Sequence, residues 1–157
     1  MAHHVVEVPG AEAREDLYER DYYSWALEQA QALRARRTEA LDWENLAEEV
    51  EGLGRGEVRE LESRLEVLLV HLLKWRYQPK KRSRSWRLTI REQRQRVARV
   101  MSQNPGLKRT FGESLSAAYA LARLLAARET MLAERTFPPN SSWTFEQITD
   151  ADFWPKS

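Results

Sequence analysis

The sequence is 157 residues long, is 42% hydrophobic with six tryptophans, contains no cysteine and carries a net charge of +1. This composition predicts one folded domain in a reducing compartment, which we expect to be the cytoplasm, and it excludes disulfides, thiolate metal sites and cysteine nucleophiles. The longest apolar run, Val67–Leu73, is interrupted by His71 and falls far short of the roughly 20 residues that a membrane span needs. The N-terminus lacks the pattern of a signal peptide. We therefore expect no membrane partner.

Charge is segregated along the chain. Residues 1–73 hold 8 Lys and Arg against 17 Asp and Glu, whereas residues 74–109 hold 13 against one. Residues 110–157 hold 4 against 6. A near-neutral protein with such blocks is expected to present one acidic and one basic region.

The first half of the chain predicts an extended arm and then amphipathic helices. Residues 1–15 lack periodicity and read as a flexible N-terminal arm, and a single helical domain is expected over residues 16–157. A first helix begins near Asp16. Asp42 is a candidate N-cap for a second helix, whose apolar stripe is Trp43, Leu46, Ala47, Val50 and Leu53. Glycines at positions 52, 54 and 56 are expected to stop or bend that helix, since each costs about 1 kcal/mol in a helix interior.

The next helix, over about residues 57–77, is expected to be the centre of the fold. Leu61, Leu65, Leu68, Leu72 and Trp75 recur at spacings of three and four, and further apolar residues cover the other sides, as is typical of a helix buried all round. Pro79 should terminate it.

The second half predicts three more helical stretches. Ser85 is expected to cap a helix over residues 86–103, a turn at 104–106 leads to a helical region over about 105–134, and the Thr144 and Gln147 pair has the pattern of a capping box for a short helix over 145–150. The predicted fold is all-α: a bundle of four to five helices around the central helix, with a C-terminal segment packed across it.

Several short motifs along the chain are distinctive when they are taken together. The most specific is the string His71–Trp75, followed downstream by Trp86 and Arg94. The others are Asp21 with Trp25, Asp42, Leu46, Glu48, Glu49, Gly52–Gly54, Glu57, Gln78-Pro79, Asn104–Leu107, Tyr119–Arg123, Glu129-Thr130 and the tail from Phe137-Pro138 to Pro155.

On these residues the chain resembles, over about residues 18–155, a bacterial all-helical family known as domain of unknown function 29. The family more often has Ser at position 106, where this chain has Gly. The resemblance implies a helical fold and a cytosolic bacterial setting. It implies no activity, substrate or catalytic residue.

The strongest functional signal is the basic segment 74–99. Its candidate binding residues are Lys80, Lys81, Arg84, Arg87, Arg91 and Arg94, and the four arginines run at i, i+3, i+7 and i+10, as a ridge on one helix face. One hypothesis is a non-enzymatic binding module that contacts a protein or nucleic-acid partner through this ridge. The competing interpretations are internal pairing with the acidic residues, a solvated helix face, or a homo-oligomer in which basic and acidic faces meet.

The alternative hypothesis is a metal-binding protein or metal-dependent hydrolase centred on His71. Glu48, Glu49 and Glu57 would supply the carboxylates. Helical di-metal proteins use a Glu three residues before the His, where this chain has Leu68. No nucleophile elbow or phosphate loop is present in the sequence. We therefore favour a protein that is not an enzyme and needs no cofactor.

Overall fold

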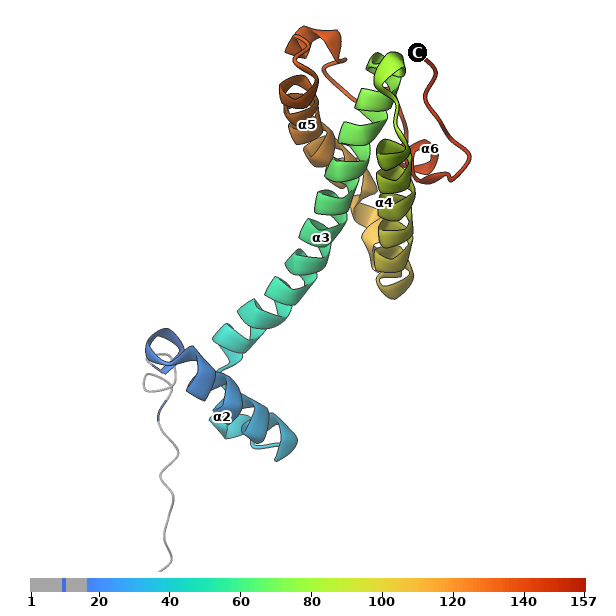
Figure 1. Cartoon of the computed structure of the whole chain (residues 1–157). Helices are drawn as coiled ribbons and strands as arrows, with labels where there is room; N and C mark the ends of the chain where they lie inside the picture. The colour runs from blue at the N-terminus through green and yellow to red at the C-terminus, as the bar shows by residue number, and fades with distance from the viewer. Residues whose placement is uncertain (1–9, 11–16) are drawn as a thin grey trace, which may run out of the picture. The chain divides into compact units, whose positions relative to one another are not determined.

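The computed structural model describes residue 10 and residues 17–157, and the elements in this part of the chain are helical (Figure 1). The α-helices are α2 (Tyr22–Arg34), α3 (Trp43–Tyr77), α4 (Arg84–Gln103), α5 (Phe111–Thr130) and α6 (Phe145–Thr149). The 3-10 helices are η1 (Thr38–Ala40), η2 (Pro79–Lys81), η3 (Pro105–Thr110) and η4 (Glu134–Thr136). The described residues contain no strand, and the predicted all-α fold is confirmed. Apart from Gly10, the predicted N-terminal arm lies outside the described residues.

The chain divides into two compact units, unit 1 (Met1–Gly54) and unit 2 (Arg55–Ser157). Unit 1 has 5 Lys and Arg against 13 Asp and Glu, a net charge of −8, and unit 2 has 20 against 11, a net charge of +9. The division describes packing within each unit, and the single domain over residues 16–157 stays a prediction.

Unit 1 is held by polar contacts between α2 and the start of α3. Trp25 donates its indole N–H to Asp42 Oδ2 at 2.9 Å, and Gln29 Oε1 accepts from the Asp42 backbone N–H at 2.7 Å. Asp42 Oδ1 also accepts from the Asn45 backbone N–H at 3.4 Å, as an N-cap does. One buried carboxylate therefore both starts α3 and holds α2 against it.

The three glycines do not interrupt α3, and this corrects the sequence expectation. The helix is continuous over 35 residues, from Trp43 through positions 52, 54 and 56 to Tyr77. Each described glycine keeps a negative φ. Once a helix exists on both sides, extending it adds one hydrogen bond per residue fixed. That gain, with Glu, Leu and Arg as neighbours, outweighs the low propensity of isolated glycines.

The C-terminal half of α3 is the core of unit 2, as predicted. Leu61, Leu65, Leu68 and Leu72 are fully buried. This half of α3 passes between α4 and α5 in Figure 1, and buried residues from both helices and from the C-terminal segment join the same cluster. These include Ile90, Val97, Ala118, Ala122, Ala126, Phe137, Trp143 and Ile148.

The ends of the later helices follow local sequence signals, with one shift. Ser83, rather than Ser85, caps α4, because its hydroxyl accepts from the Trp86 backbone N–H at 3.1 Å and lets the helix begin at Arg84. The capping box of Thr144 and Gln147 forms at α6 as predicted.

The glycines of α3 generate a stability prediction. A Cβ added at Gly54 or Gly56 would meet nothing within 4 Å, so Gly54→Ala and Gly56→Ala should each stabilise the helix by about 0.5–1 kcal/mol. Circular dichroism during urea and thermal unfolding measures the change. Gly10→Ala, at a residue outside the helices with equally open surroundings, is the control and should leave the transition unchanged. A fall in stability on either α3 substitution would contradict the assignment of these glycines to a continuous helix.

Candidate functional site

A group of exposed cations follows the end of α3 and runs along α4, and we call it the basic edge. It consists of Lys80, Lys81, Arg84, Arg87 and Arg91. Among the described residues, no carboxylate forms a salt bridge with any of the five. The internal pairing with acidic residues that the sequence left open is therefore not found for these side chains, and their charge faces solvent.

The turn between α3 and α4 sets the direction of the two lysines. Pro79 ends α3 and opens η2, and Arg82 then fastens the turn, because its Nε donates to the Trp75 carbonyl at 2.8 Å. The Arg82 guanidinium also lies 4.9 Å from the centre of the Trp75 ring. With Arg82 held against the core, Lys80 and Lys81 are left on the outside.

Arg94 was predicted to lie on the ridge with the other three arginines, but its side chain is buried and bonds to the C-terminal segment. It is 6% exposed, and its guanidinium donates to the carbonyls of Ile148 at 2.8 Å, Phe153 at 2.6 Å and Ala151 at 3.4 Å. Ten residues of α-helix fall roughly 80° short of three full turns. Because Arg84 points outward, the side chain of Arg94 on the same helix points toward the core. Burial lowers the pKa of the Arg94 guanidinium from its ordinary value.

Tryptophans connect several cations of the segment to the core. The Trp75 and Trp154 rings are 4.7 Å apart, with Arg94 over Trp154 at 5.4 Å and Arg87 over Trp75 at 5.7 Å. Lys74 pairs with Glu129 of α5 at 2.7 Å and also lies 4.7 Å from the ring centre of Trp86. Part of the predicted binding segment thus holds the fold together, and the basic edge is what projects from it.

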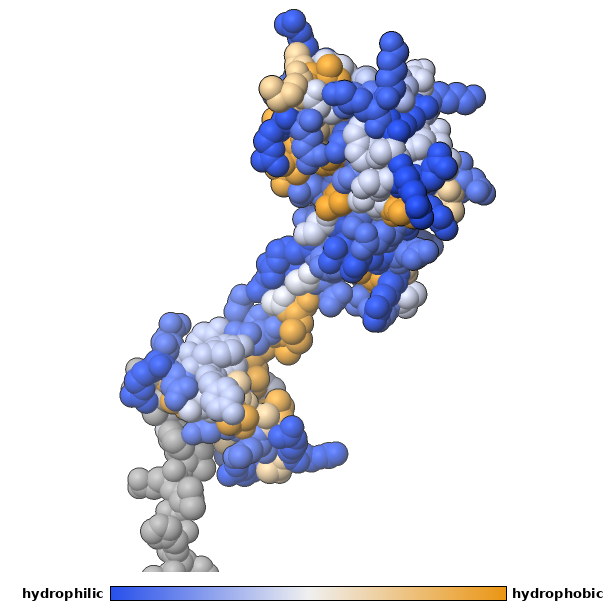
Figure 2. Space-filling view, in the orientation of Figure 1, coloured by the Kyte–Doolittle hydropathy of each residue, from blue (hydrophilic) through white to orange (hydrophobic). Residues whose placement is uncertain are grey.

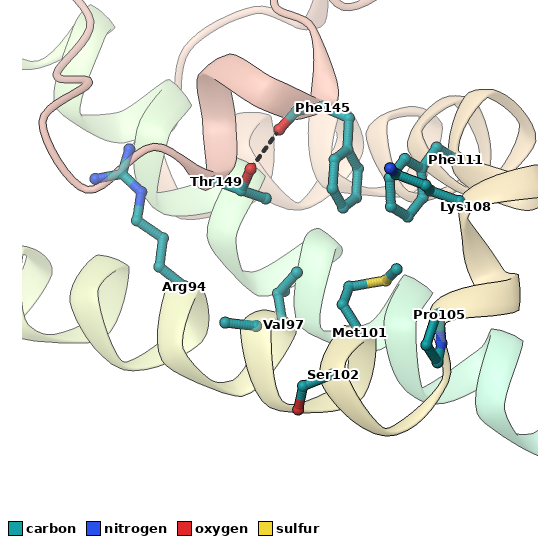
Figure 3. A pocket seen from close by; sticks show the side chains of 10 residues that line it. Arg94, Val97, Met101, Ser102, Pro105, Lys108, Phe111, Phe145 and Thr149 are labelled. Carbon is teal, nitrogen blue, oxygen red and sulfur yellow. Dashed lines mark hydrogen bonds between the residues drawn. The ribbon is translucent and has the colours of Figure 1, made fainter.

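An open apolar pocket of about 490 Å³ lies beside α4 (Figure 3). Val97 and Met101 line one side, and the stacked rings of Phe111 and Phe145, 3.7 Å apart, line the other. Lys108 lies near the ring pair, and Arg94 is at the opposite end with its guanidinium turned away. The pocket is built from α4, η3, α5 and α6, segments far apart in sequence, so no sequence pattern indicated it.

The four residues of the metal hypothesis have other contacts. Glu49 accepts from the Tyr18 hydroxyl at 2.6 Å and from the Tyr22 hydroxyl at 2.7 Å, and Glu57 accepts from Asn104 Nδ2 at 2.9 Å. Glu48 is exposed on α3. Within the described part of the chain, no group of three or more His, Asp or Glu side chains is arranged to hold a metal ion.

His71 is half-buried on α3 and turns back onto its own helix. Its Nδ1 lies 2.8 Å from the Val67 carbonyl, so this nitrogen carries the proton and donates. Burial is the main effect on its pKa, which is lowered from the ordinary value, and nearby Lys74 lowers it further. One backbone hydrogen bond therefore accounts for the position of the His71 ring.

Comparison with known proteins adds a family but no activity. A protein-family model matches residues 17–154, and the description of that family is Domain of unknown function DUF29. No curated protein and no solved structure matches the chain. A helix long and apolar enough to cross a membrane is absent from the described residues.

The structural role of Arg94 is testable against that of its exposed neighbour. Arg94→Lys keeps the charge but cannot reach three carbonyls with one ammonium group, so it should lower the free energy of unfolding by about 2–4 kcal/mol. Arg91→Lys, at an exposed position of the same helix, should change it by less than about 0.5 kcal/mol. Urea unfolding measures both. Equal effects of the two substitutions would contradict the assignment.

The contact between Glu49 and the two tyrosines predicts a pH dependence in unit 1. The hydrogen bond to Glu49 is the main cause that raises the pKa of Tyr18 to about 12. The contact therefore stabilises the fold below pH of about 10, the ordinary pKa of tyrosine, and this contribution is lost as pH rises through about 12. In Glu49→Gln the tyrosinate absorbance should rise at lower pH than in the wild type. Glu44→Gln, an exposed control on the same helix, should titrate as the wild type does.

Proposed function

The chain belongs to the family described as Domain of unknown function DUF29, whose description assigns no activity, and we propose that it is a non-enzymatic binding module that holds an acidic macromolecule against its basic edge. The observation that carries this proposal is the exposure of five neighbouring cations for which the described residues supply no carboxylate. Unit 2, which bears them, has a net charge of +9. Such a surface attracts an acidic partner over a distance of about 10 Å at ordinary ionic strength.

The chemistry of the edge supports binding rather than catalysis. Lysine and arginine side chains neutralise anionic groups and donate charge-assisted hydrogen bonds to them. Arg84 and Arg91 stand seven residues apart on α4, about two helical turns, with Lys80 and Lys81 beyond the helix start. This spacing suits an extended row of anionic groups, whether the phosphates of a nucleic acid or the carboxylates of an acidic protein surface.

A fourfold substitution tests the proposal. Replacing Lys80, Lys81, Arg84 and Arg91 by Gln should weaken binding of a nucleic-acid duplex or of an acidic partner protein. For nucleic acid, the slope of log affinity against log salt should fall by about 1 for each phosphate contact removed. Arg87 is left in place because it stacks on Trp75. Gel shift and calorimetry over a salt series are the measurements.

The control removes the same amount of charge elsewhere on unit 2. Arg109, Arg128, Arg135 and Lys156 are all exposed, and their replacement by Gln gives an equal net charge. The control should keep most of the affinity if the edge is the site, and should lose as much as the edge variant if binding depends on net charge alone. Equal loss would overturn the assignment of the edge, and no binding of any acidic macromolecule by the wild type would overturn the function.

A further inference from the structure

The apolar pocket beside α4 plays no part in the proposed function, yet it has the features of a small-molecule site (Figure 3). Its volume of about 490 Å³ lies within the range of roughly 300–1,000 Å³ that ligand pockets occupy. Met101, Phe111 and Phe145 line it and are only half-buried, so part of each side chain stays accessible to a ligand. In Figure 2 the visible face of unit 2 is mainly hydrophilic, with hydrophobic surface in small separate areas. Against such a surface, an apolar hollow is a candidate for binding.

The pocket continues along the same side of α4. A second hollow of about 350 Å³ shares Arg94, Ala98 and Thr149 with it, so the two are adjoining sections of one groove, which we call the α4–α6 groove. On α4 the groove runs from Arg91 to Ser102. These residues are eleven positions apart, which corresponds to about 16 Å of helix. The groove is therefore long enough for a ligand larger than a single ring.

The charged side chains that line the α4–α6 groove are all cations. They are Arg91 and Arg94 on α4 and Lys108 on η3. None of the described residues that line the groove is Asp or Glu. Such a lining repels a cationic ligand and attracts an anionic one. The groove therefore suits a molecule that combines an apolar body with an acidic group.

Lys108 is the cation that the larger section leaves for that acidic group. Ser102 and Thr149 each donate a hydroxyl hydrogen to a carbonyl of their own helix at 2.8 Å. Arg94 donates to three carbonyls, and its guanidinium points away from the pocket. Lys108 is exposed, and the described residues provide it with no salt bridge. Its ammonium group lies on the same side of the pocket as the two phenylalanine rings in Figure 3.

We propose that the α4–α6 groove binds a small amphipathic acid. The apolar body lies between α4 and the Phe111 and Phe145 pair, and the anionic group, a carboxylate or a phosphate ester, pairs with the ammonium of Lys108. Apolar contact supplies the affinity, and the charge pair fixes the orientation. This inference goes beyond the proposed function, because the ligand is a small molecule and Lys108 is not part of the basic edge.

Two fluorescent probes with the same ring system test the role of charge on the full chain. Anilinonaphthalene sulfonate carries one anionic group, and phenylnaphthylamine has the same rings without it. Lys108→Gln should weaken binding of the sulfonate probe about fivefold to tenfold and leave the neutral probe within about twofold of the wild type. Lys81→Gln is the matched control, because it removes an equal charge from an exposed lysine outside the groove, and it should bind both probes as the wild type does.

A second substitution tests the place of binding. Ala98 lines both sections of the groove and is exposed, so Ala98→Glu adds a carboxylate to the groove without altering the core. Like charges brought together should weaken the sulfonate probe on the order of tenfold. Ala117→Glu adds the same charge at an exposed position of α5 that does not line the groove, and it should leave binding unchanged. Circular dichroism of all four variants should match that of the wild type.

Three results would overturn the proposal. The first is a wild type that binds the sulfonate probe with a Kd weaker than about 1 mM. The second is binding that neither Lys108→Gln nor Ala98→Glu changes, because the probes would then lie elsewhere, for example on the exposed apolar residues of unit 1. The third is an equal loss of both probes in Lys108→Gln, which would remove the pairing of charges. Lys108→Gln keeps the whole basic edge, so its binding of nucleic acid tests the proposed function separately.

Discussion

The fold of unit 2 depends on how the guanidinium of Arg94 is satisfied. A charged group 6% exposed would be costly in an apolar core, but here it meets three carbonyls of the C-terminal segment. The Ile148 carbonyl lies in the last turn of α6, and the other two carbonyls follow the helix. The same contacts therefore stabilise the charge and satisfy backbone acceptors. Through Trp154, which lies against both Arg94 and Trp75, the segment is connected to α3 as well. One side chain on α4 thereby joins the last 10 residues described here, 148–157, to the central helix.

Cations in this chain have two distinct roles, and burial separates them. Arg82 and Arg94 give their donors to backbone carbonyls and their planar faces to tryptophans. Arginine suits both contacts, because its guanidinium is flat, weakly hydrated and always charged. Lys80, Lys81 and Arg91, a few residues away, have neither type of contact among the described residues and extend into solvent. The basic edge therefore consists of cations of segment 74–99 that the fold leaves exposed.

The same segregation of charge gives the two units opposite character. Unit 1 combines a small core, an exposed apolar stripe and an excess of carboxylates, and unit 2 combines a large core with an exposed basic face. The two net charges nearly cancel, so the chain as a whole carries only +1. The acidic character of unit 1 and the basic edge of unit 2 are thus two consequences of one arrangement of charge along the sequence.

The sequence by itself determined the helical class, the capping box at Thr144 and the buried row of the central helix, because helical periodicity and local hydrogen bonds act over a few residues. That row is Leu61, Leu65, Leu68, Leu72 and Trp75. It also located the basic segment. Only the tertiary structure decided which of those cations are exposed, since that depends on where residues 148–153 place their carbonyls around Arg94. The continuity of α3 through its glycines depends on helix cooperativity, and the exposure of Trp43, Val50 and Leu53 depends on which described residues pack against α3. Neither is encoded in spacing alone.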